Sequence, residues 1–144
     1  MDADALTFAD AAREHFDAIV RIERAAGGSS LVALTEGQAL DEALRRGHYV
    51  MVALDGDTVA GWIWFSVDGG RGGEEIGQLF RVAVAPERAR SGVGRALVEH
   101  AHAALAARAC TRMRVTLTGH DEATRAFLAS IGYEVDAVIM ERLL

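Results

Sequence analysis

The residues from Val82 to Leu97 combine an apolar strand, a turn rich in arginine and glycine, and the start of a helix. The strand ends at Pro86, and glycines follow at positions 92 and 94. The first N–H groups of a helix have no intrahelical partner, and the helix dipole places partial positive charge there. Glycine lets the backbone approach a phosphate closely and adopt positive φ. The segment is therefore a candidate cradle for a phosphate-bearing ligand.

Two common phosphate-binding loops do not fit this segment. A Walker loop requires a lysine, and the chain contains none. A dinucleotide-binding fingerprint requires a third glycine, where this chain has Leu97. An alternative is that the glycines only make a tight connection and that the arginines form a solvated surface. Residues 81–95 carry four arginines but a single acid, Glu87, which favours a small anionic ligand.

The composition indicates one globular domain spanning residues 1–144. The chain has 51% hydrophobic and 25% charged residues. A net charge of −6 argues against nucleic acid or an anionic membrane as a general partner. A single cysteine, Cys110, excludes an intrachain disulfide, and the N-terminus lacks an apolar signal segment. We therefore expect a cytoplasmic protein, and we expect no metal site.

Hydrophobic periodicity and turn residues predict an alternation of strands and helices. The expected strands are 6–9, 49–54, 59–67, 75–85, 113–117 and 133–143, and the expected helices are 11–26, 36–46, 93–109 and 121–131. The order β-α-α-β-β-β-α-β-α-β is typical of an α/β domain. Its central sheet would be mixed, mostly antiparallel and flanked by helices.

Two motifs resemble those of the GNAT superfamily of acyl-CoA N-acyltransferases. The first is V-x-V-x-P followed by Q/R-x-x-G-x-G/A at the start of a helix. Residues 82–94 match it except at Ala89, which stands at the Q/R position between two arginines. The second is N-x-x-A-x-x-x-Y-x-x-x-G-F/Y, which residues 121–133 match at Gly132 and Tyr133. The asparagine, alanine and tyrosine positions hold Asp121, Thr124 and Leu128 instead. The resemblance extends over nearly the whole chain.

This resemblance implies acetyl-CoA as the acyl donor and a primary amine of a small molecule or peptide as the acceptor. The amine would attack the thioester directly in a ternary complex. The pantetheine arm would lie along the strand at residues 82–84, and the pyrophosphate on the amides of residues 90–95. The implied cofactor-binding residues are Val82, Ala83, Val84, Arg88, Arg90, Ser91, Gly92, Val93, Gly94, Arg95, Asp121 and Phe127.

The residues that would transfer protons depart from the family pattern. Gln78 stands where many relatives have a glutamate, and Leu128 stands where the usual acid is a tyrosine. Glu75 and His120 are the remaining candidates for the general base, and each could equally be a solvated residue. Water or Ser130 could protonate the leaving thiolate, which is a good leaving group without help.

Two other functions stay open. The chain could bind acyl-CoA as a regulatory module without turnover, or it could be an interaction domain with no affinity for CoA. The acceptor would contact residues 27–38, the aromatic strand and residues 68–74, where the family signature is weakest. Relatives are often dimers, so a homodimer is a further expectation from the resemblance.

Overall fold

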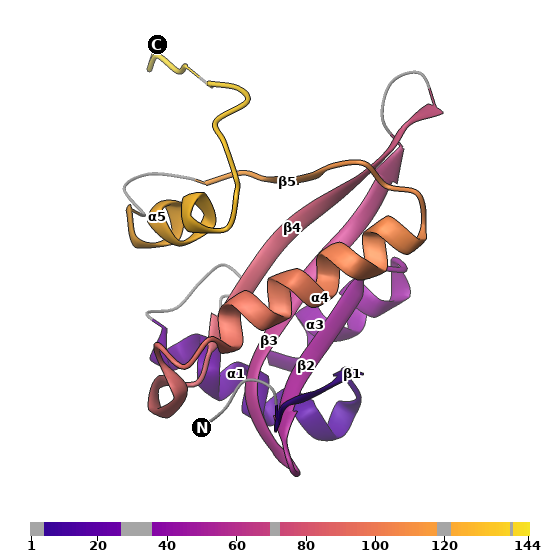
Figure 1. Ribbon diagram of the computed structural model, residues 1–144, viewed down its shortest axis with the longest axis vertical. Coiled ribbons are helices and arrows are strands. Elements are labelled where there is room, and N and C mark those ends of the chain that lie inside the picture. The colour runs from indigo at the N-terminus through magenta and orange to yellow at the C-terminus, as the bar shows by residue number, and fades with distance from the viewer. Residues whose placement is uncertain (1–4, 27–35, 70–72, 118–121, 139) are drawn as a thin grey trace.

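A computed structural model describes residues 5–26, 36–69, 73–117, 122–138 and 140–144, and of residues 36–39 the backbone alone. From the first strand to α5 (Glu122–Ser130) the elements follow the expected order (Figure 1). They are β1 (Thr7–Asp10), α1 (Arg13–Ala25), α3 (Glu36–Arg45), β2 (Tyr49–Asp55), β3 (Thr58–Gly69), β4 (Glu75–Val84), a 3₁₀ turn (Pro86–Arg88), α4 (Val93–Ala107), β5 (Met113–Val115) and α5 (Glu122–Ser130).

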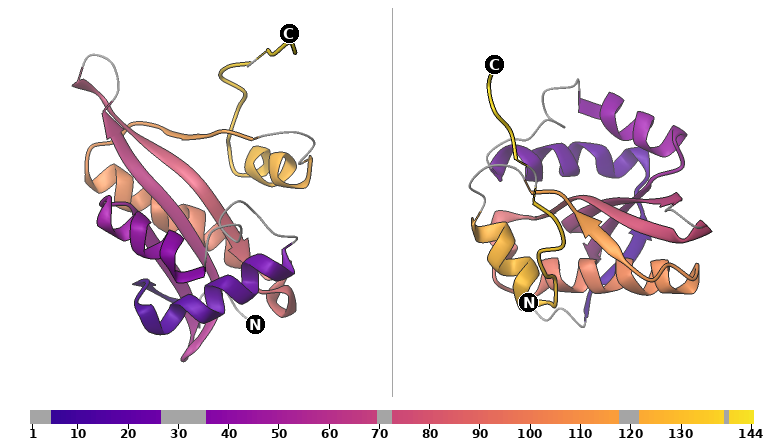
Figure 2. Two further views of the ribbon diagram at one scale, coloured as in Figure 1. Left: turned by 180° about the vertical axis from the view of Figure 1, so that it is seen from behind. Right: turned by 90° about the horizontal axis from the view of Figure 1, so that it is seen from above.

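The five strands form one sheet in the order β1-β2-β3-β4-β5. The first three pairings are antiparallel and β4 pairs with β5 in parallel, which confirms the mixed, mostly antiparallel sheet. Helices α1 and α3 cover one face of the sheet and α4 covers the other, with α5 beside α4 (Figure 2). The protein is therefore a three-layer α/β structure, as its sequence order indicates.

Alternation along β3 divides the core between the two faces of the sheet. Trp62 belongs to the apolar cluster under α1 and α3, and its neighbour Ile63 belongs to the cluster under α4. Both side chains are fully buried. Side chains two residues apart share a face, so Trp64 lies on the α1/α3 face and Phe65 on the α4 face.

The expected strand at 133–143 is wrong. The described residues of this segment contain no strand, and the chain leaves the body of the protein as an extended tail (Figure 1). Val135, Val138 and Met140 are each more than half exposed. A strand needs the backbone groups of a neighbour, and none of the described residues of this segment pairs with β5, the edge strand of the sheet. Alternating apolar residues alone do not supply that neighbour.

Two further observations concern membrane-spanning helices and the single cysteine. No helix within the described ranges is long and apolar enough to cross a bilayer. Cys110 is a free cysteine, partly buried at the end of α4.

Candidate functional site

The parallel strands β4 and β5 are paired over a short stretch only. Their register runs from Gly77 opposite Met113 to Leu79 opposite Val115, and β5 then ends. The other side of β4 stays paired with β3 as far as Val84. Residues 80–84 therefore present one unpaired edge within the described structure, and the ribbons of β4 and β5 diverge there (Figure 1). We call residues 80–84 the open edge of β4.

The backbone of the open edge points its polar groups outward at alternate residues. The Ala85 N–H donates to the Ala60 carbonyl on β3, and the Ala83 carbonyl also faces β3, close to Gly61. Because successive residues of a strand direct their N–H and C=O groups to opposite sides, those of Val82 and Val84 face away from β3. Two backbone positions predicted to hold a pantetheine arm thus offer groups that an added strand could use.

The loop between β4 and α4 holds a second set of unpaired backbone groups. Gly92 is the N-cap of α4 with φ of 87°, a left-handed conformation suited to glycine. The Ala96 N–H donates to the Gly92 carbonyl, which is the first hydrogen bond of the helix. The N–H groups of residues 93–95 have no partner in the described part of the chain. The sequence predicts an anion cradle at these three groups.

The arginines around this loop have different surroundings. Arg88 is mostly buried and pairs with Asp55 of the β2–β3 hairpin at 2.8 Å, and Arg95 pairs with Glu99 one turn along α4. Arg90 has φ of 62°, a strained conformation for a non-glycine residue, and no ion pair among the described residues. The Ser91 hydroxyl donates to the Arg88 carbonyl at 2.5 Å. Arg90 is thus the predicted phosphate ligand whose charge is least engaged, while Arg88 fixes the loop to the hairpin.

Helix α5 reaches this loop through Phe127. A side chain at Gly94 would meet Val84 at 3.4 Å and Phe127 at 3.5 Å, so the open edge, the loop and α5 converge at that glycine. Asp121 and His120, the other predicted residues near α5, lie outside the described residues. The structure therefore brings Val84, Gly94 and Phe127 together.

The residues at the usual acid position and beside it carry no available acidic group. Leu128 is 2% exposed and packs in the core under α4. The Ser130 hydroxyl donates to the Phe127 carbonyl at 2.5 Å. Gln78, which stands at the position where many relatives have a glutamate, is opposite Ser66 on the α1/α3 face of the sheet.

Next to α5, Tyr133 and His102 of α4 form a partly buried pair with 2.7 Å between the hydroxyl and Nε2. Burial raises the pKa of Tyr133 to about 12. Burial also lowers the pKa of His102, against a smaller opposing effect of Glu99. Both groups are therefore neutral at pH 7, and Tyr133 is a weaker acid than a solvated tyrosine.

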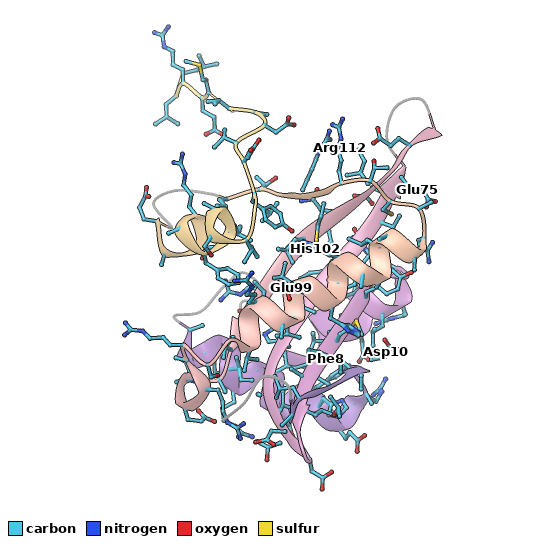
Figure 3. All side chains as sticks on the ribbon, in the orientation of Figure 1. Phe8, Asp10, Glu75, Glu99, His102 and Arg112 are labelled. Atoms are coloured by element: carbon cyan, nitrogen blue, oxygen red, sulfur yellow. The ribbon has the colours of Figure 1, made fainter. Side chains whose placement is uncertain are left out.

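Glu75, a predicted base, lies at the opposite end of β4 from the loop. It is exposed at the first residue of the strand, near the C-terminal end of α4 (Figure 3). It lies seven positions before Val82, which is about 20 Å along a strand. The structure does not bring Glu75 to the open edge.

A β-bulge at the start of the open edge places two consecutive side chains on one face. The register shifts there, so that Phe80 and Arg81 of β4 are together opposite Trp64 of β3. Arg81 donates through Nε to Glu23 of α1 at 2.6 Å. Because α1 covers this face, both side chains of the bulge point away from α4.

Sequence reasoning missed Glu23 and the ion pair it forms. Glu23 is completely buried. Its position continues the apolar stripe of α1, after Phe16 and Ile19 at helical spacing. A carboxylate on the buried stripe of an amphipathic helix requires a cationic partner, and this signal was available. The identity of that partner could not be predicted, because Arg81 lies 58 residues away in the sequence.

Three rings pack around the bulge. Phe80 stacks on His48 with 5.2 Å between ring centroids, and Trp64 lies 4.9 Å from Phe80. The Trp64 indole N–H donates to Nδ1 of His48 at 3.0 Å. In neutral His48 the proton therefore resides on Nε2. Phe80 is 42% exposed, so the edge of this group is open to solvent.

No cluster of three or more histidine, cysteine or acidic side chains suited to a metal ion occurs among the described residues. The chemistry of the region is instead that of backbone amides, arginines and aromatic rings.

Comparison with known proteins gives a family match and several structural matches. The family model described as "Acetyltransferase (GNAT) family" matches residues 12–133. No protein with curated functional data matches the sequence significantly. The fold is similar to that of a Trypanosoma brucei acetyltransferase, with 17% identity, a TM-score of 0.76 and coverage of 96% of this chain and 99% of that one.

Two other solved structures have comparable similarity. A protein from Bacillus halodurans described as a transcriptional regulator has 15% identity, a TM-score of 0.81 and coverage of 96% and 99%. An aminoglycoside acetyltransferase from an uncultured soil metagenomic sample, solved with trehalose, has 18% identity, a TM-score of 0.77 and coverage of 98% and 97%. At these identities the structural matches establish the fold.

Proposed function

Because the chain belongs to the GNAT acetyltransferase family, we propose that it transfers an acetyl group from acetyl-CoA to a primary amine of a small molecule or peptide. One observation carries this proposal. The outward backbone groups of the open edge and the unpaired N–H groups of residues 93–95 lie at successive points of one continuous segment. This combination supports an extended ligand that ends in a pyrophosphate.

Each part of the donor has a matching group on the protein. The pantetheine arm would pair with the backbone of Val82 and Val84, and the pyrophosphate would accept hydrogen bonds from the N–H groups of residues 93–95. Arg90 would add charge to the phosphates. Phe127 and Gly94 would lie between the pantetheine arm and the pyrophosphate. The other predicted ligands, including Ala83, Ser91 and Asp121, stay predictions.

The proposed reaction is direct. The amine nitrogen attacks the thioester carbonyl carbon, the C–N bond forms, and the C–S bond breaks to release the CoA thiolate. The amine loses one proton, and the thiolate gains one on leaving the site. An outward amide of the open edge would stabilise the developing oxyanion. No covalent intermediate on the protein is required.

The proposed reaction requires an acceptor for the amine proton and a proton donor for the thiolate. With Leu128 buried, the thiolate would be protonated by water, which a thiol of pKa about 8.5 permits. Glu75 and His120 stay the predicted bases. Since Glu75 lies far along β4, it could act only through intervening water molecules. Glu75→Gln and His120→Ala, assayed for the pH dependence of kcat/KM, would show whether either residue removes the proton.

The wider setting is also proposed. We expect a cytoplasmic protein that binds neither nucleic acid nor membranes and that forms a homodimer. Light scattering coupled to gel filtration would give the mass in solution and test the dimer.

Acetyl-CoA titration followed by thermal unfolding tests the binding half of the proposal. A saturating ligand that binds the native state raises Tm, and an unchanged Tm would contradict any CoA-binding function. Release of free thiol across a panel of amines then tests turnover. Binding without thiol release would instead favour the acyl-CoA-binding regulatory module, for which the buried Leu128 is the supporting observation.

A further inference from the structure

The bulge in β4 creates a surface on the sheet face opposite α4, made of Phe80, Arg81, Glu23, His48 and Trp64, which we call the bulge surface. Its residues come from α1, β3, β4 and the turn before β2, and they meet through one stacked ring pair, one tilted ring pair and one ion pair. None of them belongs to the loop or to the backbone positions that would hold acetyl-CoA.

The charge of the bulge surface that solvent can reach is positive. The Glu23 side chain is 0% exposed and that of Arg81 is 27% exposed. A ligand can therefore reach the Arg81 side chain but not the Glu23 carboxylate. A cationic group would find no accessible partner here, whereas an anionic one would find a charged donor.

Glu23 also orients Arg81. The Glu23 carboxylate accepts a hydrogen bond from Nε of Arg81. Within the described residues this is the hydrogen bond that the Arg81 guanidinium donates. The two terminal nitrogens, Nη1 and Nη2, are left without a protein partner in that part of the chain. Two parallel N–H groups on a planar guanidinium match the two oxygens of a carboxylate. Holding Nε in place reduces the side-chain entropy that such a contact would cost.

Phe80 supplies an apolar platform directly beside this donor. Its ring is held by His48 and Trp64, yet 42% of the residue remains exposed. The bulge puts Phe80 and Arg81 side by side on the same face, although they are consecutive residues. A ligand that carries a carboxylate next to an apolar group could contact both at once.

The bulge surface adjoins the place where the acetyl group would lie. Arg81 is covalently bonded to Val82, whose backbone faces the open edge. An amine positioned to attack a thioester at Val82 would have the Arg81 guanidinium on its α1 side. A carboxylate one carbon away from that amine is the arrangement found in an α-amino acid.

We propose that the acceptor is a free amino acid with an aromatic or large apolar side chain, whose carboxylate binds Arg81 and whose side chain packs on Phe80. This inference rests on the acetyl transfer proposed above. Glu23 acts as a positioning residue, because it contacts Arg81 and not the acceptor.

The test compares two acceptors that differ by the carboxylate alone, L-phenylalanine and 2-phenylethylamine. We expect kcat/KM for L-phenylalanine to exceed that for 2-phenylethylamine by at least about 30-fold, as a lost charge-assisted hydrogen bond implies. The double variant Glu23→Gln/Arg81→Gln removes both charges of this ion pair. In this variant the kcat/KM ratio of the two acceptors should fall to within about threefold, a loss of preference that a purely structural ion pair would not produce.

A matched control removes a second arginine–glutamate pair. Arg112 and Glu74 pair at 3.7 Å near the opposite end of β4, and both are exposed. The variant Glu74→Gln/Arg112→Gln should retain the full preference. If Glu23→Gln/Arg81→Gln fails to fold, Arg81→Lys keeps the ion pair but removes the planar fork. It should lose at least tenfold of the preference, by the same argument about bidentate geometry.

A binding measurement without turnover distinguishes failure of this inference from failure of the proposed acetyl transfer. Calorimetry would measure the Kd of N-acetyl-L-phenylalanine for the protein saturated with CoA, and the double variant should raise that Kd at least about tenfold. If no amine releases CoA, acetyl transfer is refuted and the Kd comparison decides the inference. Equal kcat/KM for the two acceptors, or equal Kd in wild type and variant, would overturn it.

Discussion

Replacing Gly92 by alanine tests two properties of the loop before α4, its contribution to thermal stability and its ability to bind CoA. Gly92 has φ of 87°, and an L-residue in this conformation costs about 1–2 kcal/mol. For a 144-residue domain the entropy of unfolding is about 0.3 kcal/mol per degree. The Tm of Gly92→Ala without ligand should therefore fall by about 3–7 °C.

Ligand binding should suffer as well. The strain relaxes when φ moves away from 87°, and this motion displaces the N–H groups of residues 93–95 that form the cradle. Acetyl-CoA at one hundred times its Kd stabilises a protein by about 2.7 kcal/mol, or about 9 °C here. A tenfold weaker Kd removes about 1.4 kcal/mol of this stabilisation. The ligand-induced rise in Tm should then fall by about half.

Gly47→Ala is the matched control. Gly47 also has positive φ, 78°, and open space around it, but it lies at the end of α3 on the other face of the sheet. It should lose similar stability and keep the full shift with acetyl-CoA. Differential scanning fluorimetry over a ligand series measures both quantities. Equal ligand-induced shifts in the two variants would refute the role given to the cradle.

Three other predictions follow from the packing. Gly61→Ala would place a Cβ 2.9 Å from the Ala83 carbonyl. It should lower the free energy of unfolding in urea by about 1–3 kcal/mol. It should also weaken the binding of acetyl-CoA measured by calorimetry, because β4 must shift, and an unchanged Kd would count against β4 as the donor site. Leu128→Tyr should cost about 1–3 kcal/mol through overpacking yet change kcat less than about tenfold, since a thiolate leaves readily; a larger rise would mean that the missing acid limits the wild type. His102 has a lowered pKa in the native state, so the unfolded chain binds more protons and stability should fall as pH drops below 6.5. Tyr133 keeps its proton up to about pH 12 when folded, so stability should also fall from pH 10 to 12, and Tyr133→Phe should lose less there.

Local signals in the sequence were sufficient to predict the strand, turn and helix of the proposed donor site. The glycine turn, the proline that ends β4 and the apolar stripe of α4 are short-range features, and the structure has a left-handed Gly92 at the N-cap where they place it. The order of strands and helices is likewise set by periodicity within each element.

Features that depend on distant partners could not be predicted in this way. The bulge at Phe80 is a property of the pairing between β3 and β4, and the ion pair of Arg88 with Asp55 joins residues 33 apart. The same cause accounts for the wrong strand at 133–143. Its alternation is real, but whether a strand forms depends on a neighbouring edge that its own residues do not specify.

The most direct test of the central claim is the stoichiometry of a single reaction. Acetyl-CoA and an amine such as 2-phenylethylamine would be incubated with the protein, and free CoA thiol and N-acetylated amine would be quantified together by mass spectrometry. The account predicts one N-acetylated amine for each thiol released, at a rate proportional to protein concentration and reduced in Gly92→Ala at subsaturating acetyl-CoA. Bound acetyl-CoA with no amine-dependent release of thiol over a broad amine panel would contradict it.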